Sequence, residues 1–182
     1  MDISMDISVY DDFFVISNVL SVEDIETIHS VYKPIDIGHQ SNTSHWIVES
    51  DKKTRIEAYN REVTIIGIKE DSLSFISDKI KECFRNLLDR EVTLEYPHYY
   101  TQYTEGGFHS LHIDAGIDEF DRRYAIILHL SDPSDYEGGD LIVNDIVTPK
   151  EKGIAIVFDG RKPHEVTTVT KGERFIISEC IC

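Results

Sequence analysis

The sequence predicts a mainly β protein in which two helices precede a β-sandwich or β-barrel. Two observations favour this fold class. In the first half of the chain, apolar residues recur in two segments at the helical steps of three and four. In the second half, short β-rich runs alternate with Gly, Pro and Asp, and seven or more short strands at such spacing are typical of a sandwich or barrel.

The length and composition of the chain fit one folded domain, with 182 residues of which 41% are hydrophobic and 29% charged. A chain of this size buries about 70% of the surface that it exposes when unfolded. We therefore expect a single domain over 1–182. Its helices and supporting strands would lie in 1–91 and its β core in 92–182.

The charge of the chain bears on its partners. The 18 Lys and Arg residues against 34 Asp and Glu residues give a formal net charge of −16. Because this charge repels phosphate, we expect no nucleic-acid partner. It favours a basic partner or substrate, and solubility alone is the other interpretation.

Targeting signals are missing from the sequence. No apolar stretch approaches the roughly 18 to 20 residues that span a bilayer, and the acidic start lacks the basic and apolar regions of a signal peptide. The three cysteines are too few for a disulfide scaffold and suit a reducing compartment. We therefore expect a soluble, cytoplasmic protein that does not enter membranes.

The first helix is expected to begin at a capping-box signature, Ser21-Val22-Glu23-Asp24. Apolar residues follow it at helical spacing as far as Tyr32. Residues 33–60 are polar and irregular, which is typical of a long surface loop. We expect this loop to be a candidate lid, with Trp46 and Arg55 as substrate contacts.

The second helix is indicated by apolar residues at steps of three and four, after a potential cap at Asp71. These residues are Leu73, Ile76, Ile80, Phe84 and Leu87. From about residue 92 the pattern changes to β-rich runs. The expected strands lie within 92–103, 108–113, 122–130, 139–143, 153–158, 163–169 and 173–181.

The residues with the clearest chemistry are His112, Asp114 and His164. On a strand, residues two apart project to the same face, so His112 and Asp114 can ligate one metal ion. That pair alone is a weak signal. A second strand and turn bring His164, 52 positions after His112. Two His and one carboxylate form the facial triad of non-haem iron(II) oxygenases.

Arg174 lies on the final strand, ten residues beyond His164. If its face of the strand points into the barrel, the guanidinium is a buried cation that requires a carboxylate partner. A guanidinium grips a carboxylate with two parallel hydrogen bonds. A dicarboxylic cosubstrate that reaches the metal at one end and Arg174 at the other would satisfy this requirement.

The segment from about Tyr99 to Ser178 resembles the catalytic domain of prolyl 4-hydroxylase-like iron(II)/2-oxoglutarate-dependent oxygenases. The resemblance rests on an ordered set: Tyr103, Gly106-Gly107, His112-Ile113-Asp114, Arg123, Leu130-Ser131-Asp132-Pro133, Tyr136-Glu137-Gly138-Gly139-Asp140-Leu141 and the segment from His164 to Arg174. It implies a double-stranded β-helix, or cupin-like jelly roll, with flanking helices. It also implies that 1–182 is one oxygenase domain whose catalytic core is 92–182.

The resemblance implies roles for six residues. His112, Asp114 and His164 would bind Fe(2+), and Arg174 would hold the distal carboxylate of 2-oxoglutarate. Tyr103 matches a tyrosine near the bound cosubstrate, although a core aromatic is the other interpretation. His129 stands where several members have a tyrosine that assists the basic residue, and a core histidine is the alternative. The sequence departs from its relatives again at Cys180, where a tryptophan is common.

The implied reaction is hydroxylation of a C–H bond with release of succinate and CO2, and ascorbate is the expected reductant. A prolyl residue of a peptide or protein is the first choice of substrate. A free amino acid or small metabolite is the alternative within enzymes. A non-catalytic module that binds iron and 2-oxoglutarate is the alternative from another class.

Two further features receive ordinary interpretations. Alternation along a strand places His109 on the face of Leu111 and not on that of His112, so we do not expect His109 to be a metal ligand. The pair Gly138-Gly139 lacks the Gly-Lys-Ser/Thr of a phosphate loop, and a turn before Leu141 explains it.

Overall fold

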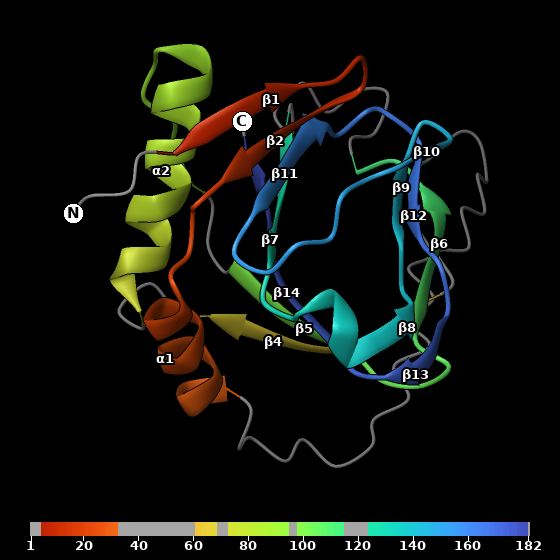
Figure 1. Cartoon of the computed structure of the whole chain (residues 1–182). Helices are drawn as coiled ribbons and strands as arrows, with labels where there is room; N and C mark the ends of the chain where they lie inside the picture. Colours follow the sequence, from red (N-terminus) through yellow and green to blue (C-terminus); the bar gives the residue numbers. More distant parts are fainter. Residues whose placement is uncertain (1–4, 33–60, 69–72, 95–97, 115–123, 182) are drawn as a thin grey trace, which may run out of the picture.

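Two antiparallel sheets face each other, and two helices cover the outer side of the larger sheet (Figure 1). This computed structural model describes residues 5–32, 61–68, 73–94, 98–114 and 124–181. The arrangement is a jelly roll, and it confirms the predicted mainly β class with flanking helices. Residues 33–60, with the expected lid and its Trp46 and Arg55, lie outside the described residues.

The larger sheet has seven strands in the order β1-β2-β11-β7-β14-β5-β4. Their bounds are β1 Asp6–Val9, β2 Phe13–Ser17, β11 Ala155–Asp159, β7 Tyr124–His129, β14 Arg174–Ile181, β5 His98–Tyr103 and β4 Thr64–Ile68. The smaller sheet has five strands in the order β10-β9-β12-β6-β3. Their bounds are β10 Ile146–Val147, β9 Leu141–Val143, β12 His164–Val166, β6 Phe108–His112 and β3 Arg61–Glu62.

A third pair, β8 Tyr136–Gly138 with β13 Val169–Gly172, joins the two sheets at one end (Figure 1). A short 3₁₀ helix, Pro133–Asp135, precedes β8. All the pairings between strands are antiparallel within the described residues. Each expected β-rich run contains at least one of these strands, although residues 95–97 of the first run lie outside the description.

The first helix, α1 (Val22–Tyr32), begins as the sequence predicts. The backbone N–H of Ser21 donates to Asp24 Oδ2 over 2.8 Å, and the N–H of Asp24 donates to Ser21 Oγ over 3.1 Å. The two residues therefore satisfy each other's free donors, and the predicted capping box is confirmed.

The second helix, α2 (Ser74–Leu88), buries the face that its spacing indicates. Leu73, in the left-handed region at φ 56°, is the N-cap residue. Asp71, the expected cap, lies outside the described residues. Packing of the apolar face stabilises this helix.

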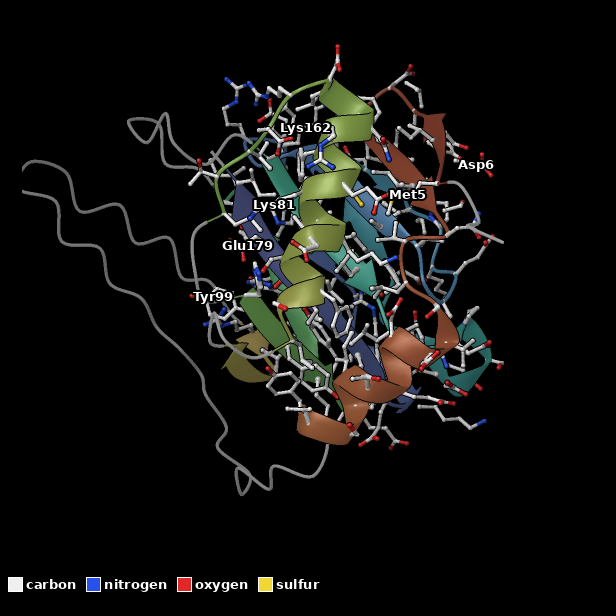
Figure 2. The ribbon with its side chains drawn as sticks, turned by 90° about the vertical axis from the view of Figure 1, so that its left-hand side faces the viewer. Met5, Asp6, Lys81, Tyr99, Lys162 and Glu179 are labelled. Carbon is white, nitrogen blue, oxygen red and sulfur yellow. The ribbon has the colours of Figure 1, made fainter. Side chains whose placement is uncertain are left out.

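The larger sheet is buried on both faces. Figure 2, turned by 90°, shows α2 lying in front of the sheet. Residues such as Phe84, Tyr100 and Ile177 fill the layer between the helices and this sheet, whereas Tyr103, Ile156 and Ile176 fill the layer between the sheets. Because alternate residues of a strand face opposite sides, Arg174 shares the inner face of β14 with Ile176.

A buried polar link joins α2 to the sheet. Ser77 Oγ lies 2.9 Å from His98 Nε2, and His98 Nδ1 forms a hydrogen bond with Glu179 Oε2. His98 begins β5 and Glu179 lies near the end of β14, the strands that carry Tyr103 and Arg174 at their opposite ends. In the described part of the chain, no helix combines the length and the apolarity needed to cross a membrane.

Candidate metal centre and anion site

Three ligand-type side chains meet between β6 and β12 of the smaller sheet. His112 ends β6, His164 begins β12, and the two are paired across the sheet. Asp114 lies between them, with its Oδ1 3.5 Å from His112 Nε2 and its Oδ2 3.5 Å from His164 Nε2. One ligand atom from each of the three residues lies within 4.8 Å of the others, which suits a single metal ion.

Backbone carbonyls orient both imidazoles. His112 Nδ1 lies 2.7 Å from the carbonyl oxygen of Ser110, and His164 Nδ1 lies 3.0 Å from that of Lys162. Since a carbonyl oxygen only accepts, each Nδ1 carries the proton and donates it. Each Nε2 therefore presents its lone pair toward Asp114. Metal-binding histidines are usually held by such a hydrogen bond from the other ring nitrogen.

The ionisation of these groups favours the metal-binding forms. Burial lowers the pKa of His164, so the ring stays neutral near pH 7. Burial raises the pKa of Asp114, but the neighbouring His112 and His164 outweigh this effect and hold the pKa of that carboxyl below its usual value. A carboxylate and neutral imidazoles are the species that bind a metal ion.

His109 is not among the three clustered ligand-type residues of the described chain, as expected, but the prediction that its ring faces away from His112 is wrong. β12 pairs His164 with His112 but Val166 with His109. The three-residue step from His112 to His109 on β6 is therefore paired with a two-residue step on β12. This irregularity breaks the alternation on which the prediction rested. The ring of His109 stacks on that of His112, with centroids 3.8 Å apart. Burial and the nearby His112 lower the pKa of His109 to about 3.

Arg174 is the second notable feature of the space between the sheets. It begins β14 opposite Tyr103 of β5, and its side chain is 1% exposed. Within the described residues, none of its three guanidinium nitrogens has a hydrogen-bond partner. Its Cζ lies 5.0 Å from the centroid of the Tyr103 ring. A buried cation in this state calls for an anion.

Other buried polar atoms also lack hydrogen-bond partners in the described part of the chain, namely His129 Nε2, Tyr136 Oη and Thr148 Oγ1. Of these residues, His129 lies close enough for the charge of Arg174 to act on it. Burial, followed by the charge of Arg174, lowers the pKa of His129 well below its usual value, so the ring is neutral and one of its nitrogens can donate. Arg174 and His129 together offer one fixed positive charge and a neutral donor, which fits a carboxylate.

Glycine at position 139 makes room for Arg174. A Cβ at Gly139 would lie 3.1 Å from Arg174 Cδ and 3.3 Å from Tyr136 Cε2. Tyr136 and Gly139 therefore both lie against the arginine side chain. Sequence reasoning gave no role to Tyr136 or Thr148, since a hydroxyl-bearing residue has no distinguishing spacing. Only the folded structure shows that their hydroxyls are buried.

Tyr103 lies within electrostatic reach of both parts of the site. Burial raises its pKa, the Arg174 cation opposes this shift, and the Asp114 carboxylate adds to it. The six residues singled out in the sequence therefore fall into two groups in one inter-sheet space. His112, Asp114 and His164 form a cluster, while Tyr103, His129 and Arg174 are buried around an unpartnered charge.

Residues 98–181 match the model of the 2OG-Fe(II) oxygenase superfamily. These residues, a little under half of the chain, are similar to members of this superfamily. The name implies iron(II) and 2-oxoglutarate, and the residues present fit both groups. The His-Asp-His cluster suits the metal, and the unpartnered Arg174 suits a dicarboxylate.

Similar curated proteins are PKHD-type hydroxylases. One from Sphingopyxis alaskensis is 36% identical over 89 residues, which are 44% of this chain and 41% of that protein. One from Caulobacter vibrioides is 45% identical over 51 residues, which are 26% and 22% of the two chains. This chain therefore matches less than half the length of these relatives.

Similar solved structures extend the likeness in fold to nearly the whole chain. A viral collagen prolyl hydroxylase from Paramecium Bursaria Chlorella virus-1, in its 2OG complex, matches with a TM-score of 0.67 and 18% identity over 94% of this chain and 96% of that one. A Pseudomonas putida prolyl-4-hydroxylase matches with a TM-score of 0.64 and 18% identity over 93% and 91%. These matches confirm the jelly-roll fold.

Proposed function

We propose that this protein is an iron(II)- and 2-oxoglutarate-dependent dioxygenase that hydroxylates a prolyl residue of a peptide or protein. The observation that carries the proposal is the buried, unpartnered Arg174 in the same inter-sheet space as the His-Asp-His cluster. A metal cluster alone is compatible with many functions. A metal cluster together with a buried cation that suits an anionic cosubstrate favours this reaction class.

In this proposal His112, Asp114 and His164 hold iron(II). Three ligands from one side leave coordination positions for other molecules. Bound iron and 2-oxoglutarate supply oxidative decarboxylation coupled to hydroxylation, which yields succinate and CO2. The carbonyl oxygens of Ser110 and Lys162 keep the Nδ1 proton on each imidazole, so both Nε2 atoms stay available as ligands.

Arg174 holds the distal carboxylate of 2-oxoglutarate. The guanidinium is fully buried, so its attraction for a carboxylate is little screened by water. His129 donates a hydrogen bond from its neutral ring to the same carboxylate. Tyr103 closes the wall of the pocket, with its ring facing the guanidinium. These buried groups exclude water from the cosubstrate.

The prolyl substrate is supported by relatives. The curated relatives are PKHD-type hydroxylases, and a similar structure is a prolyl hydroxylase from Trichoplax adhaerens in complex with a peptide fragment of hypoxia inducible factor. That structure matches with a TM-score of 0.64 and 17% identity over 94% of this chain and 83% of that one. The net charge of −16 suits a basic peptide.

The remaining parts of the proposal concern the setting of the enzyme. Ascorbate serves as the reductant that keeps the iron in its iron(II) form. The chain acts as one oxygenase domain over 1–182, with its catalytic core in 92–182. Its small number of cysteines suits the cytoplasm.

The test measures succinate from purified protein given iron(II), 2-oxoglutarate, ascorbate and oxygen. The control is the double variant His112→Ala/Asp114→Ala. We expect succinate from the wild type alone, and more of it when a proline-containing basic peptide is added. Stimulation by free amino acids and not by any peptide would contradict the prolyl-peptide substrate. No succinate under any condition would contradict the enzyme itself.

A further inference from the structure

His109 occupies a position that an unbroken strand would not give it. Between β6 and β12 the register shifts, so that His164 faces His112 while Val166 faces His109. The extra residue on β6 turns the His109 ring toward the metal cluster. A bulge next to a functional site often serves to re-aim a side chain in this way.

The ring of His112 lies against two other imidazoles. The His109 ring is 3.8 Å from it between centroids and inclined by 25°, which is a stacked arrangement. The His164 ring is 4.1 Å away and inclined by 53°. His112 is therefore in close contact with one ring of the metal cluster and with one ring outside it.

His109 does not itself complete the metal cluster. Among the described residues, the atoms that come within 4.8 Å of one another belong to His112, Asp114 and His164 alone. On the neighbouring strand β3, Arg61 is paired with His109 across the sheet, so the cation next to His109 disfavours a further positive ion there. The contact that His109 makes is with the face of the His112 ring and not with a ligand atom.

Stacking constrains a motion that the hydrogen bond of His112 leaves open. The bond from Nδ1 to the carbonyl oxygen of Ser110 fixes the tautomer and one direction of the ring. By itself, a hydrogen bond at Nδ1 does not fix the tilt of an imidazole ring about that bond. A flat group pressed on its face at 3.8 Å limits this tilt. The aim of Nε2 toward Asp114 then depends on both contacts.

We propose that His109 is a positioning residue, whose ring stacks on the metal ligand His112 and aims its Nε2 at the metal. This inference rests on the proposed function, in which His112 binds iron(II). It assigns no ligand or proton-transfer role to the nitrogens of His109. The aromatic face alone carries the effect.

The test compares His109→Phe with His109→Leu. Phe keeps a flat ring without nitrogens, whereas Leu fills similar space without a ring. Cobalt(II) is the probe: its affinity is measured by calorimetry and its coordination by the visible absorption of the bound ion. We expect His109→Leu to weaken cobalt binding by about 10-fold and to change the spectrum, since supporting residues are worth about 10- to 100-fold in metal affinity. We expect His109→Phe to stay within about 3-fold of the wild type.

The outcomes separate this inference from the proposed function. Equal losses in Phe and Leu would overturn it, because the nitrogens and not the ring would then matter. An unchanged Leu variant would overturn it too. Thermal unfolding of the metal-free variants checks that each one is folded. If the wild type itself bound no cobalt(II) or iron(II), the proposed function would fail, and the role of His109 would fail with it.

Discussion

The two ends of the inter-sheet space differ in the groups that they present to a ligand. At the metal end, backbone carbonyls hold the Nδ1 protons of His112 and His164, so both Nε2 lone pairs face the Asp114 carboxylate, and the Asp114 side chain is 22% exposed. At the other end, Arg174 is 1% exposed and its guanidinium has no hydrogen-bond partner within the described residues. The first end presents only acceptors and suits a cation, and the second presents a buried cation and suits an anion.

Because Arg174 is buried without a partner, part of the free energy of carboxylate binding comes from removing a penalty that is present in the ligand-free protein. An unpartnered buried donor costs about 1–3 kcal/mol, and more for a charged group. The packing of the larger sheet offsets this cost, because Ile176 and Ile177 are buried on the two faces of the strand that carries Arg174. A carboxylate that enters this end relieves the penalty. At the metal end, a cation relieves the repulsion between the facing lone pairs of the two imidazoles and the Asp114 carboxylate.

The largest effect is expected at the metal end. Asp114→Ala removes the carboxylate that lies 3.5 Å from both imidazoles and leaves two ligands. Because supporting residues alone are worth about 10- to 100-fold in metal affinity, we expect a loss above about 100-fold. Anaerobic titration with iron(II) measures it. Binding as tight as that of the wild type would show that the metal lies elsewhere.

The next effect is expected at the anion end. Arg174→Gln removes a charge-assisted pair worth about 1.5–3 kcal/mol, so the KM for 2-oxoglutarate should rise about 10- to 150-fold. Iron affinity should not change, because no ligand is altered. Succinate formation at varied 2-oxoglutarate measures the shift. An unchanged KM would refute the role of Arg174.

Loss of the Arg174 charge should weaken 2-oxoglutarate binding but should not lower the stability of the ligand-free protein. Arg174→Met replaces an unpartnered buried cation with an apolar side chain of similar length. Replacing buried charges in this way is often neutral or stabilising by about 1–4 kcal/mol. Without ligands, the variant should therefore unfold at a temperature equal to or higher than that of the wild type. With saturating 2-oxoglutarate, the wild type should gain stability and the variant should not.

A smaller effect is expected from Gly139→Ala. The added Cβ would lie 3.1 Å from Arg174 Cδ and 2.9 Å from Val169 Cγ2, so the guanidinium must shift. We expect the KM for 2-oxoglutarate to rise about 3- to 10-fold, within the roughly 1–3 kcal/mol of overpacking. Gly106→Ala is the matched control, since Gly106 also has a positive φ but a Cβ there meets nothing within 4 Å. An equal rise in both variants would mean that backbone strain is the cause.

The smallest effect concerns pH. The folded-state pKa of His129 is lowered by burial and by Arg174, so below about pH 6.5 the unfolded chain takes up a proton that the folded chain does not. Stability should fall with decreasing pH by up to about 1.4 kcal/mol per unit for this residue. Urea unfolding of the metal-free protein at pH 7, 6 and 5 should show a shallower decline for His129→Leu. An identical decline would show that His129 does not contribute.

Local signals in the sequence predicted the parts of the site that lie on regular strands. The alternation around Arg174 follows from strand geometry, and the structure has it. His112 ends β6 and Asp114 lies two residues beyond its end, so the two side chains meet although only His112 is on the strand. The capping box at Ser21 is a local signal as well, and it is present. Such features depend only on neighbours in the chain.

The parts that the sequence did not predict depend on contacts between distant segments. The shift between β6 and β12 that turns His109 inward arises from pairing across the sheet, which period-two reasoning does not contain. Tyr136 and Thr148 carry buried hydroxyls without a partner in the described part of the chain, and no local spacing predicts this. The left-handed Leu73 before α2 likewise has no polar signature.

The most direct test of the two-ended site is an anaerobic titration of 2-oxoglutarate into the iron-loaded protein, followed by its visible charge-transfer absorption. The wild type should show a saturating band. Asp114→Ala should show no band, and Arg174→Gln should show the same band at about 10-fold or more higher 2-oxoglutarate. A wild type without a band, or an Arg174→Gln variant with an unshifted curve, would contradict the assignment of iron to one end and of 2-oxoglutarate to the other.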